Sequence, residues 1–286
     1  MEPQNNLAWV TGANGLIGNY FVSTAPQFAP QWQVRGLTRA QFDLLDFQAT
    51  EREFKKDRPR CIIHCAAIPT VVGALADPGL ARRINVEATR FLVELAAETK
   101  FIFLSTDFVF DGRKGNYLET DPVNPISFYG ETKVAAEEIV LTHPSAIVVR
   151  TSINCGTSKS GLRGFNEALR HDLRTRGSIK MFTDEFRSPM FAGETARAGW
   201  ELAAKDCAGI FHAAGAERLS RWQMGQLLAL RSPELKSKME PGLIRDSSGP
   251  PRAPDTSLDI SKIQKILSRP LPGLTEWLAA NPDEPF

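Results

Sequence analysis

Tyr129 and Lys133 are the two side chains in this sequence whose types and spacing point most directly to chemistry. Side chains four residues apart share one face of a helix, which would bring the lysine ammonium beside the phenol. A positive charge at that place favours the phenolate and lowers the phenol pKa from about 10, as suits a proton donor or acceptor at a carbonyl group. The same spacing also arises by chance between a tyrosine and a lysine on a surface helix.

The neighbouring sequence favours the chemical interpretation. A turn that contains Pro125 precedes a helix expected over residues 127–141, and this helix follows a predicted strand that ends in 105–107. Open sheets of parallel strands bind ligands at the carboxyl ends of their strands. Both features therefore direct Tyr129 and Lys133 towards a sheet edge where a ligand would bind.

A glycine-rich turn at residues 11–18 is the second candidate site. It follows a predicted strand and opens a helix, the context in which such a turn binds a dinucleotide. Gly12 would permit the tight turn, Gly15 would let the backbone approach a pyrophosphate, and Gly18 would let the helix pack closely on the sheet. Free N–H groups at the helix start would bind the anion. Four further alternations of strand and helix follow, so we predict a dinucleotide site formed by Gly12, Asn14, Gly15, Leu16, Ile17 and Gly18.

Selectivity between the two nicotinamide cofactors should lie just after the second strand. An acidic residue there would bind the ribose 2′-hydroxyl of NAD, whereas an arginine would accommodate the 2′-phosphate of NADP. The sequence reads Leu-Thr-Arg at 37–39, with no acid, which favours NADP(H) and leaves NAD(H) as the alternative. Arg39 could instead be a solvated loop charge, and Asp43 or Asp46 could face the adenosine. We assign Arg39, Asp43 and Leu44 to the predicted cofactor site.

The elements that must position these residues follow from the first half of the chain. Short apolar runs alternate there with helical patterns, which predicts an α/β fold with a Rossmann-type doubly wound parallel sheet. The continuous apolar runs at 61–66 and 101–105 are typical of strands buried on both faces, and helical spacing predicts a helix at 81–98 between them. The other expected strands are 7–11, 33–37, 42–44 and 146–150, and the other expected helices begin at about Leu16 and cover 49–58.

The pattern becomes irregular after Thr151, and a Pro-rich segment at 246–255 is expected to be a loop. We therefore predict an NAD(P)-binding Rossmann domain at residues 1–151. Residues 152–286 would form a smaller substrate-binding region that is partly interleaved with this domain.

The composition argues against several classes of partner. The 286 residues carry a formal net charge of +1, so no excess of positive charge is available for a nucleic acid backbone or an anionic membrane surface. No apolar run reaches the roughly 18 residues that span a bilayer, and the first residues lack the pattern of a signal peptide. We expect a cytoplasmic protein with a small-molecule substrate, no nucleic acid partner and no membrane partner, and leave a homodimer open.

The four cysteines are sparse for this length. Cys61 and Cys65 lie four residues apart inside an apolar run, without the second pair that would complete a zinc site. We therefore expect buried free thiols and no metal site.

Taken together, the sequence resembles the extended short-chain dehydrogenase/reductases of the NAD-dependent epimerase/dehydratase superfamily over nearly the whole chain. The specific likeness is to the dTDP-4-dehydrorhamnose reductase branch. It rests on Ser-Thr-Asp-Phe-Val-Phe-Asp-Gly at 105–112, Tyr-Gly-Glu-Thr-Lys at 129–133 and Val-Arg-Thr-Ser at 149–152. Weaker echoes follow at 187–189, 209–215 and 257–259.

The resemblance implies a reaction in which NADPH or NADH delivers hydride to a keto carbon of a nucleotide-activated sugar. Tyr129 would protonate the resulting oxygen, and Lys133 would bind the nicotinamide ribose and hold down the Tyr129 pKa. Thr106 would hydrogen-bond the carbonyl oxygen, and Asp107 would help to position the substrate or relay a proton.

The resemblance also covers residues around the predicted cofactor. Cys65, Ala66 and Ala67 stand at the end of the expected strand at 61–66 as small residues over which the cofactor would lie. Asn85 matches a helix position near the active site of the family, and an asparagine on a plain helix surface is an equal alternative.

The chain departs from the family after Arg150. The sugar reductases commonly have an aromatic-rich stretch there, whereas this sequence reads Ser-Ile-Asn-Cys-Gly at 152–156, so the substrate contacts of that stretch do not carry over. Arg187 is the best basic candidate for a substrate diphosphate, because a guanidinium binds phosphate in two-pronged fashion. A salt bridge to Asp184 or Glu185 has equal weight. The predicted substrate contacts are Thr106, Asp107 and Arg187.

Three functions are compatible with these residues. An NADP(H)-dependent reductase of a nucleotide-sugar keto group, similar to dTDP-4-dehydrorhamnose reductase, accounts for the set of Thr106, Tyr129 and Lys133. A nucleotide-sugar epimerase or dehydratase uses the same fold and pair with a retained NAD. A non-catalytic NADP-binding regulatory subunit is the third, because a relative of this branch is the non-catalytic partner of methionine adenosyltransferase. The fold alone does not decide between them.

Overall fold

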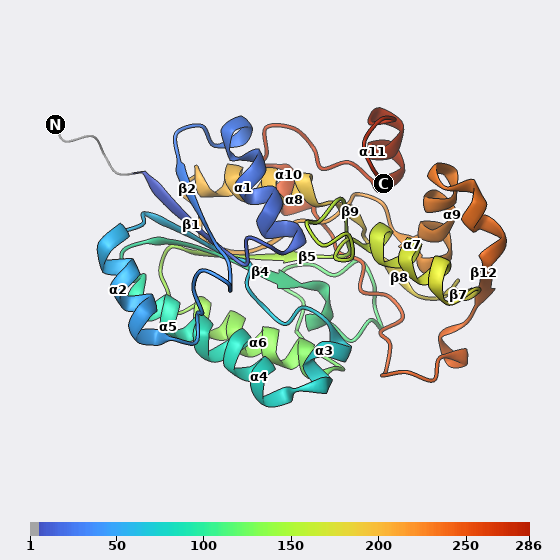
Figure 1. The fold of residues 1–286 in the computed structure, drawn as a ribbon, viewed down its shortest axis with the longest axis horizontal. Helices are drawn as coiled ribbons and strands as arrows, with labels where there is room; N and C mark the ends of the chain where they lie inside the picture. Colours follow the sequence, from blue (N-terminus) through green and yellow to red (C-terminus); the bar gives the residue numbers. More distant parts are fainter. Residues whose placement is uncertain (1–5) are drawn as a thin grey trace.

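A sheet of six parallel strands forms the centre of the computed structural model, which describes residues 6–286 (Figure 1). The strands lie in the order β10-β5-β4-β3-β1-β2, and every neighbouring pair runs parallel. Their bounds are Leu7–Thr11 for β1, Gln33–Leu37 for β2, Cys61–His64 for β3, Lys100–Thr106 for β4, Ala146–Thr151 for β5 and Gly209–His212 for β10. The predicted α/β fold with a parallel sheet is confirmed.

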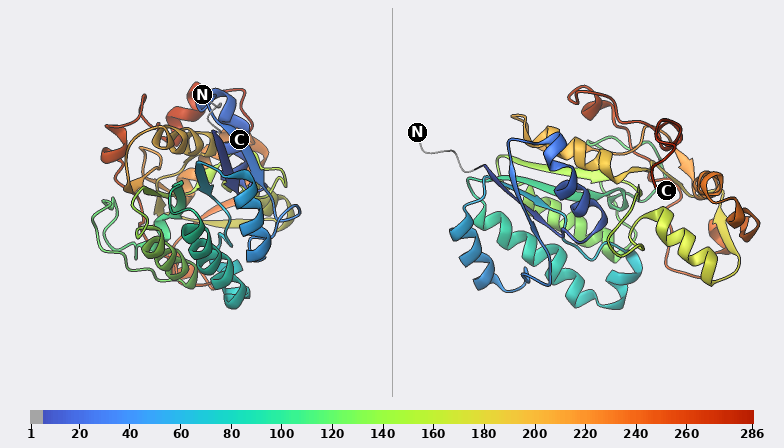
Figure 2. Two further views of the ribbon diagram at one scale, coloured as in Figure 1. Left: turned by 90° about the vertical axis from the view of Figure 1, so that its left-hand side faces the viewer. Right: turned by 45° about the horizontal axis from the view of Figure 1, so that its top comes forward.

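Helices cover both faces of this sheet (Figures 1 and 2). One face carries α1 (Leu16–Phe28), α8 (Ala192–Ala203) and α10 (Ser261–Gln264), and the other carries α2 (Phe47–Asp57), α5 (Ala88–Leu95) and α6 (Phe128–Val140). Val10 packs in the core with Phe21 and Trp200, whereas its neighbour Trp9 packs in the opposite layer. Both sides of β1 are therefore buried, which explains its apolar sequence.

The carboxyl ends of the central strands form one edge. Thr11 is in register with His64, and Thr106 is in register with Thr151. The chain leaves β1 for β2 on one side and returns across β1 to β3 on the other, so the strand order reverses between β1 and β3. Open α/β sheets leave a ligand-binding crevice at such a point.

The predicted strand at residues 42–44 is wrong. This segment forms neither helix nor strand, and it leads to Asp46, whose side chain caps α2 by accepting from the Ala49 nitrogen at 2.9 Å. Phe42 and Leu44 pack against the core layer that contains Trp9. They are apolar because they cover the sheet face, and they pair with no strand.

The predicted helix at 81–98 is divided into three parts. It begins earlier, as α4 (Pro78–Arg82), because Asp77 accepts a hydrogen bond from the Leu80 nitrogen at 2.9 Å and caps the helix. A π-helical turn (Arg83–Glu87) and α5 complete it. Helix α3 (Val71–Ala76) precedes it on the same side of the sheet (Figure 1).

Much of the second half of the chain gathers at one end of the molecule, around α7 and α9 in Figure 1. Its short strands pair as β6 with β9, β7 with β12 and β8 with β11. A separate apolar core includes Leu173, Met224 and Trp277. The bounds are Asn154–Cys155 for β6, Phe165–Thr175 for α7, Ile179–Phe182 for β7, Phe186–Arg187 for β8, Met190–Phe191 for β9, Leu219–Ser220 for β11, Arg221–Arg231 for α9, Met239–Gly242 for β12 and Leu274–Ala280 for α11. The short 3-10 helices are Asp107–Val109, Pro233–Lys238 and Ile244–Asp246.

The two halves interleave through β10 and α8. Strand β10 lies in the second half of the sequence but extends the central sheet beside β5. Helix α8 packs on α1 through the edge-to-face contact of Trp200 with Phe21, whose ring centres lie 5.7 Å apart. The boundary at residue 151 stays a prediction.

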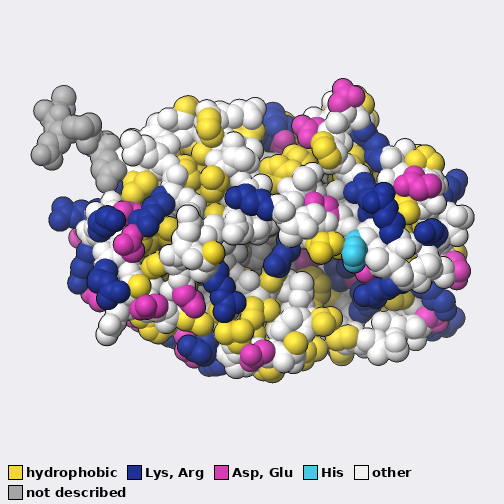
Figure 3. Space-filling view, viewed as in Figure 1, with side chains coloured by type: hydrophobic (Ala, Val, Ile, Leu, Met, Phe, Trp, Pro, Cys, Tyr) yellow, Lys and Arg dark blue, Asp and Glu magenta, His cyan; other side chains and the backbone are white. Residues whose placement is uncertain are grey.

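On the face drawn in Figure 3, neither basic nor acidic side chains form one extended patch. The two kinds intermix around a hollow near the centre. Among residues 6–286, no helix has the length and apolar character needed to cross a membrane.

The loop expected at 246–255 is confirmed for residues 247–254. Asp246 ends a 3-10 helix, and Asp255 makes an isolated bridge with Phe186.

Candidate active site

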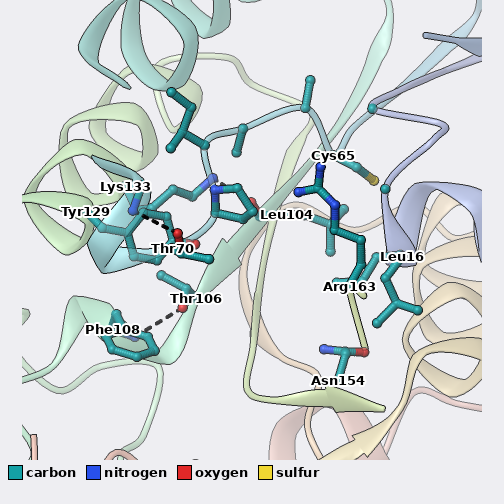
Figure 4. Close-up of a pocket in the computed structure, with 18 of the residues that line it drawn as sticks. Leu16, Cys65, Thr70, Leu104, Thr106, Phe108, Tyr129, Lys133, Asn154 and Arg163 are labelled. Atoms are coloured by element: carbon teal, nitrogen blue, oxygen red, sulfur yellow. Dashed lines mark hydrogen bonds between the residues drawn. The ribbon is translucent and has the colours of Figure 1, made fainter. Parts of the chain in front are cut away.

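A cavity of about 920 Å³ opens at the carboxyl edge of the sheet. Both halves of the chain line it, and Figure 4 shows side chains from α1, β4, α6 and the loops after β5 facing the same space. The lining includes every residue predicted to bind cofactor or substrate: Gly12, Asn14, Gly15, Leu16, Ile17, Gly18, Arg39, Asp43, Leu44, Cys65, Ala66, Ala67, Thr106, Asp107, Tyr129, Lys133 and Arg187. The structure thus brings these residues together, and their individual roles remain predictions.

The glycine turn after β1 has the shape that a pyrophosphate requires. Gly12 has a φ of 67°, in the left-handed region, and a Cβ there would lie 2.8 Å from the Ala66 nitrogen. A Cβ on Gly18 would lie 2.4 Å from the Gly12 carbonyl oxygen, so α1 packs on this turn only with glycine at that position. Within the described residues no side chain caps the start of α1, which leaves N–H groups of its first turn available to an anion. The turn therefore fits the pyrophosphate of a dinucleotide.

Tyr129 and Lys133 reach the cavity from the first turns of α6 (Figure 4). The helix begins at Ser127, whose side chain accepts a hydrogen bond from the Gly130 nitrogen at 3.2 Å. Gly130 lets this turn rest on the segment after β4, because a Cβ there would lie 2.4 Å from the Phe108 carbonyl oxygen. The helix can therefore hold Tyr129 at 7% exposure and Lys133 at 2%.

The expected lowering of the Tyr129 pKa by Lys133 is wrong. Burial raises the pKa of Tyr129 above its usual value; a hydrogen bond with Thr106 opposes this shift, and the negative charge of Asp107 adds to it. The Lys133 ammonium instead donates to the Leu104 carbonyl oxygen at 2.7 Å. Tyr129 is therefore a neutral phenol at neutral pH, the form that can donate a proton.

The pKa of Lys133 shifts in the opposite direction to that of Tyr129. Burial lowers the pKa of Lys133 to about 7, and the negative charge of Glu137 opposes this shift. The Nζ atom lies 3.8 Å from the centre of the Phe103 ring, where a cation is attracted by the aromatic face. This lysine therefore changes charge near neutral pH.

Thr106 and Asp107 lie at the end of β4 and hold one another in place. The Thr106 hydroxyl donates to Asp107 Oδ1 at 3.2 Å and accepts from the Phe108 nitrogen at 3.2 Å (Figure 4). Asp107 Oδ2 accepts from the hydroxyls of Ser152 at 2.8 Å and Thr256 at 2.9 Å. Since Asp107 is 1% exposed and both of its oxygens are occupied, these contacts favour a positioning role over a proton relay.

Asn85 joins the loop after β3 to the helix that carries Tyr129. Its Oδ1 accepts from the Ile68 nitrogen at 2.8 Å, and its Nδ2 donates to Thr132 Oγ1 at 3.0 Å. Thr132 in turn donates to the Tyr129 carbonyl oxygen at 2.7 Å. Asn85 is 1% exposed and lies in the π-helical turn, a feature frequent at functional sites. The alternative of a plain surface asparagine is therefore wrong.

A buried ion pair anchors α6 to the sheet beneath this site. Arg150 donates to Glu137 through Nη2 at 2.7 Å and Nε at 3.0 Å, and the Ser105 hydroxyl donates to the same carboxylate. Both charged side chains are less than 5% exposed. Sequence reasoning did not find this pair, although Glu137 stands four residues after Lys133 on the same helix face and Arg150 interrupts an apolar strand.

Thr11 and His64 form a second buried connection below the glycine turn. Thr11 Oγ1 lies 2.7 Å from His64 Nδ1 and accepts from the Ala66 nitrogen at 3.1 Å, while His64 Nε2 lies 3.0 Å from Thr89 Oγ1. Burial lowers the pKa of His64 to about 3, so the ring is neutral. This connection fixes the loop of Ala66 against the end of β1.

Arg187 lies in a cluster of charges on the second half's side of the cavity. Glu185 accepts hydrogen bonds from Arg187 at 3.0 Å, Arg252 at 2.9 Å and Arg221 at 3.3 Å. The Glu185 pairing, one of the two interpretations of Arg187, is confirmed, whereas Asp184 accepts from the Ile244 nitrogen instead. Arg187 is 1% exposed, so a diphosphate has little access to it. Arg221 and Arg252 beside it are more open, and a diphosphate predicted to bind here would contact them first.

The cluster has an excess of positive charge. Three guanidiniums face Glu185, and Asp107 Oδ2 lies 3.7 Å from the Nε atom of Arg187 as a second carboxylate. Burial alone would raise the pKa of Glu185, but the three arginines outweigh it and hold the pKa below its usual value. The net charge of the cluster is therefore positive, which suits an anionic ligand.

The opposite side of the cavity carries Arg39, Asp43 and Leu44 after β2. Asp46, the other acid considered for the adenosine, is occupied as the cap of α2 and does not line the cavity.

All four cysteines are free thiols, and burial raises the pKa of Cys61 to about 12. Residues 6–286 hold no group of three metal-ligating side chains.

Three arginines of the cavity were missed by sequence reasoning: Arg163, Arg221 and Arg252. They come from a loop after β6, from the start of α9 and from the Pro-rich segment. No local pattern marks them, because segments far apart in the sequence bring them to one space.

Known proteins resemble this chain over most of its length. The model of the family described as RmlD substrate binding domain matches residues 8–282. The "Probable low-salt glycan biosynthesis reductase Agl14" of Haloferax volcanii is 29% identical over 96% of each chain. Methionine adenosyltransferase 2 subunit beta of Danio rerio is 30% identical over 75% of this chain and 70% of its own length.

Among solved structures, dTDP-4-dehydrorhamnose reductase from Bacillus anthracis in complex with NADP superposes with a TM-score of 0.86. The match covers 97% of this chain and 98% of that chain at 22% identity, so it shows a shared fold.

Proposed function

The chain belongs to the RmlD substrate binding domain family, and from this premise we propose that it is an NADP(H)-dependent reductase of a keto group on a nucleotide-activated sugar. One observation carries the proposal. Thr106, Tyr129 and Lys133 line the same cavity as the glycine turn, so a proton donor and a dinucleotide site face each other at the sheet edge. The solved relative with NADP and the absence of an acid at 37–39 support NADP(H), with NAD(H) as the alternative.

The chain's own residues would perform the proton transfer and the positioning. NADPH, when bound over Gly12–Gly18 and Ala66, supplies the hydride to the keto carbon. Tyr129, a neutral phenol, would donate its proton to the oxygen of that carbon, and Thr106 would hold this oxygen by a hydrogen bond. Lys133 would bind the nicotinamide ribose.

The arginine cluster around Glu185 supports an anionic substrate. A nucleotide-activated sugar carries a diphosphate, and the partly buried guanidiniums of Arg221 and Arg252, which line the cavity, can each offer hydrogen bonds to phosphate oxygens. The substrate would then extend from the cluster to Tyr129, with its keto group at the phenol.

A direct assay tests this proposal. Purified protein is mixed with NADPH and dTDP-4-dehydrorhamnose, and the loss of NADPH absorbance is followed while mass spectrometry identifies the product. We expect NADPH oxidation in step with a product two hydrogens heavier. If no oxidation occurs with this or other dTDP-4-keto sugars at any concentration, the substrate class is rejected.

Two alternatives predict different outcomes. A nucleotide-sugar epimerase or dehydratase would retain NAD and show no net oxidation during turnover. A regulatory subunit, which the likeness to methionine adenosyltransferase 2 subunit beta supports, would bind NADP without turnover and copurify with a stoichiometric enzyme partner. The burial of Tyr129 and Lys133 beside Thr106 favours the reductase over the subunit, because a subunit without chemistry has no need of this set.

A homodimer and a cytoplasmic location are also part of the proposal. Size-exclusion chromatography with light scattering measures the first, and cell fractionation measures the second.

A further inference from the structure

We propose that residues 157–163, which we name the basic clasp, form part of the cofactor site, with Arg163 binding the cofactor pyrophosphate from the side opposite α1. The inference rests on the proposed NADP(H) site and adds to it a residue from the second half of the chain. It follows from three features of the clasp: its fixed base, its contact with α1 and the direction of Arg163.

Glu167 fixes the base of the clasp. Its carboxylate accepts hydrogen bonds from the Ser158 nitrogen at 2.8 Å, the Ser158 hydroxyl at 2.6 Å, the Arg163 nitrogen at 3.0 Å and the Gly164 nitrogen at 2.9 Å. Burial alone would raise the pKa of Glu167, but these hydrogen bonds hold the pKa below its usual value. A single charged side chain thus closes both ends of the clasp and sets the position of Arg163.

The clasp touches the helix that starts at the glycine turn. The Thr157 nitrogen donates to the Tyr20 hydroxyl at 3.1 Å, and Lys159 Nζ lies 3.4 Å from Asn14 Oδ1. Tyr20 belongs to α1, and Asn14 belongs to the glycine turn itself. Lys159 therefore places a second cation beside the predicted pyrophosphate site.

Arg163 points from the clasp into the cavity. In Figure 4 its side chain passes Leu16 and extends towards Cys65 and Leu104, across the space in front of the glycine turn. Its backbone nitrogen donates to Glu167, whereas no hydrogen bond or ion pair of the described residues involves its guanidinium. A free guanidinium opposite the N–H groups of a helix start supplies the charge that a pyrophosphate still lacks on its open side.

This arrangement separates the cofactor contacts of two arginines. Arg39 follows β2, where the 2′-phosphate of NADP is expected, so it distinguishes NADPH from NADH. The pyrophosphate is common to both cofactors. Arg163 should therefore support the binding of NADPH and NADH by the same factor.

Cofactor titration of the purified protein tests the clasp without any turnover. The fluorescence of NADPH and of NADH is followed for the wild type and for Arg163→Gln, Arg163→Lys, Arg39→Gln and the exposed control Arg60→Gln, with circular dichroism for folding. We expect Arg163→Gln to weaken both cofactors by about 10-fold or more, with partial recovery in Arg163→Lys. Arg39→Gln should weaken NADPH alone, and Arg60→Gln should bind like the wild type.

Adenosine 2′-monophosphate, which has no pyrophosphate, serves as the second probe. Its affinity should be unchanged by Arg163→Gln and reduced by Arg39→Gln. If wild-type protein binds and oxidises NADPH while Arg163→Gln binds both cofactors as tightly as the wild type, the clasp proposal is overturned and the proposed function stands. If the wild type binds neither cofactor, both proposals are rejected.

Discussion

The two sides of the cavity are built in different ways. On the first side, Thr106, Tyr129 and Lys133 belong to regular elements, β4 and α6, whose backbone hydrogen bonds fix them. On the second side, the cluster of Glu185, Arg187, Arg221 and Arg252 comes from three separate segments that are held together mainly by its own charges.

This difference assigns a different kind of work to each side. Groups on rigid elements can be held at the geometry that a proton transfer requires. A cluster of three guanidiniums around one carboxylate has a net positive charge, which suits the binding of an anion. We therefore expect changes on the first side to alter kcat, and changes in the cluster to alter KM and stability.

The largest expected effect is that of Tyr129→Phe. Removal of the phenol hydroxyl takes away the proposed proton donor, and loss of such a group reduces kcat by about 1,000-fold. Stopped-flow and steady-state assays with NADPH and the sugar nucleotide measure this fall in kcat. The affinity of Tyr129→Phe for NADPH should stay within about twofold of the wild-type affinity. Tyr117→Phe is the matched control, because Tyr117 is also buried but bonds Asp111 outside the cavity. A Tyr129→Phe enzyme with full kcat would remove the assigned role.

A second prediction concerns the stability of the cluster. Glu185→Gln would leave three guanidiniums without their shared charge, and the break of a buried pair costs about 3 kcal/mol in the free energy of unfolding. Urea denaturation near neutral pH measures the loss. Since the folded-state pKa of Glu185 is lowered, its contribution is present above its unfolded pKa and disappears as pH falls through the folded pKa. The two proteins should therefore converge in acid, and a constant difference would contradict this account.

The same contrast explains how much the sequence alone could predict. Periodicity located five of the six central strands and the glycine turn, because each depends on neighbours in the chain. The segment of Phe42 and Leu44 was misassigned because an apolar residue that covers a sheet has the same pattern as one that lies in it. The arginine cluster could not be predicted, since no local pattern relates Arg221 to Arg252. The Tyr129 pKa depends on burial, which the spacing to Lys133 does not reveal.

Arg252→Gln tests the second side of the cavity, and its expected effect on the kinetics is smaller than that of Tyr129→Phe. The loss of one charged hydrogen-bond donor should raise the KM of the sugar nucleotide about tenfold and leave kcat within about twofold. The matched control is Arg218→Gln, because Arg218 lies over the Phe186 ring as Arg252 lies over the Phe182 ring, yet it does not line the cavity. If kcat instead fell about tenfold and KM stayed unchanged, Arg252 would belong with the groups of the first side.

The last prediction is a pH dependence of stability that arises on the first side. Burial lowers the folded-state pKa of Lys133 to about 7, below its unfolded value near 10.5, while Glu137 opposes the shift. Between these two values the unfolded chain binds more protons, so the contribution of Lys133 to the free energy of unfolding rises with pH across this window. Urea denaturation of the wild type and of Lys133→Met at about pH 6 and about pH 9 isolates this contribution as a difference of differences. The wild type should gain stability relative to Lys133→Met at the higher pH. An equal difference at the two pH values would mean that Lys133 keeps its charge in the folded protein, and that regular elements hold it as an ion in the manner of the cluster on the second side.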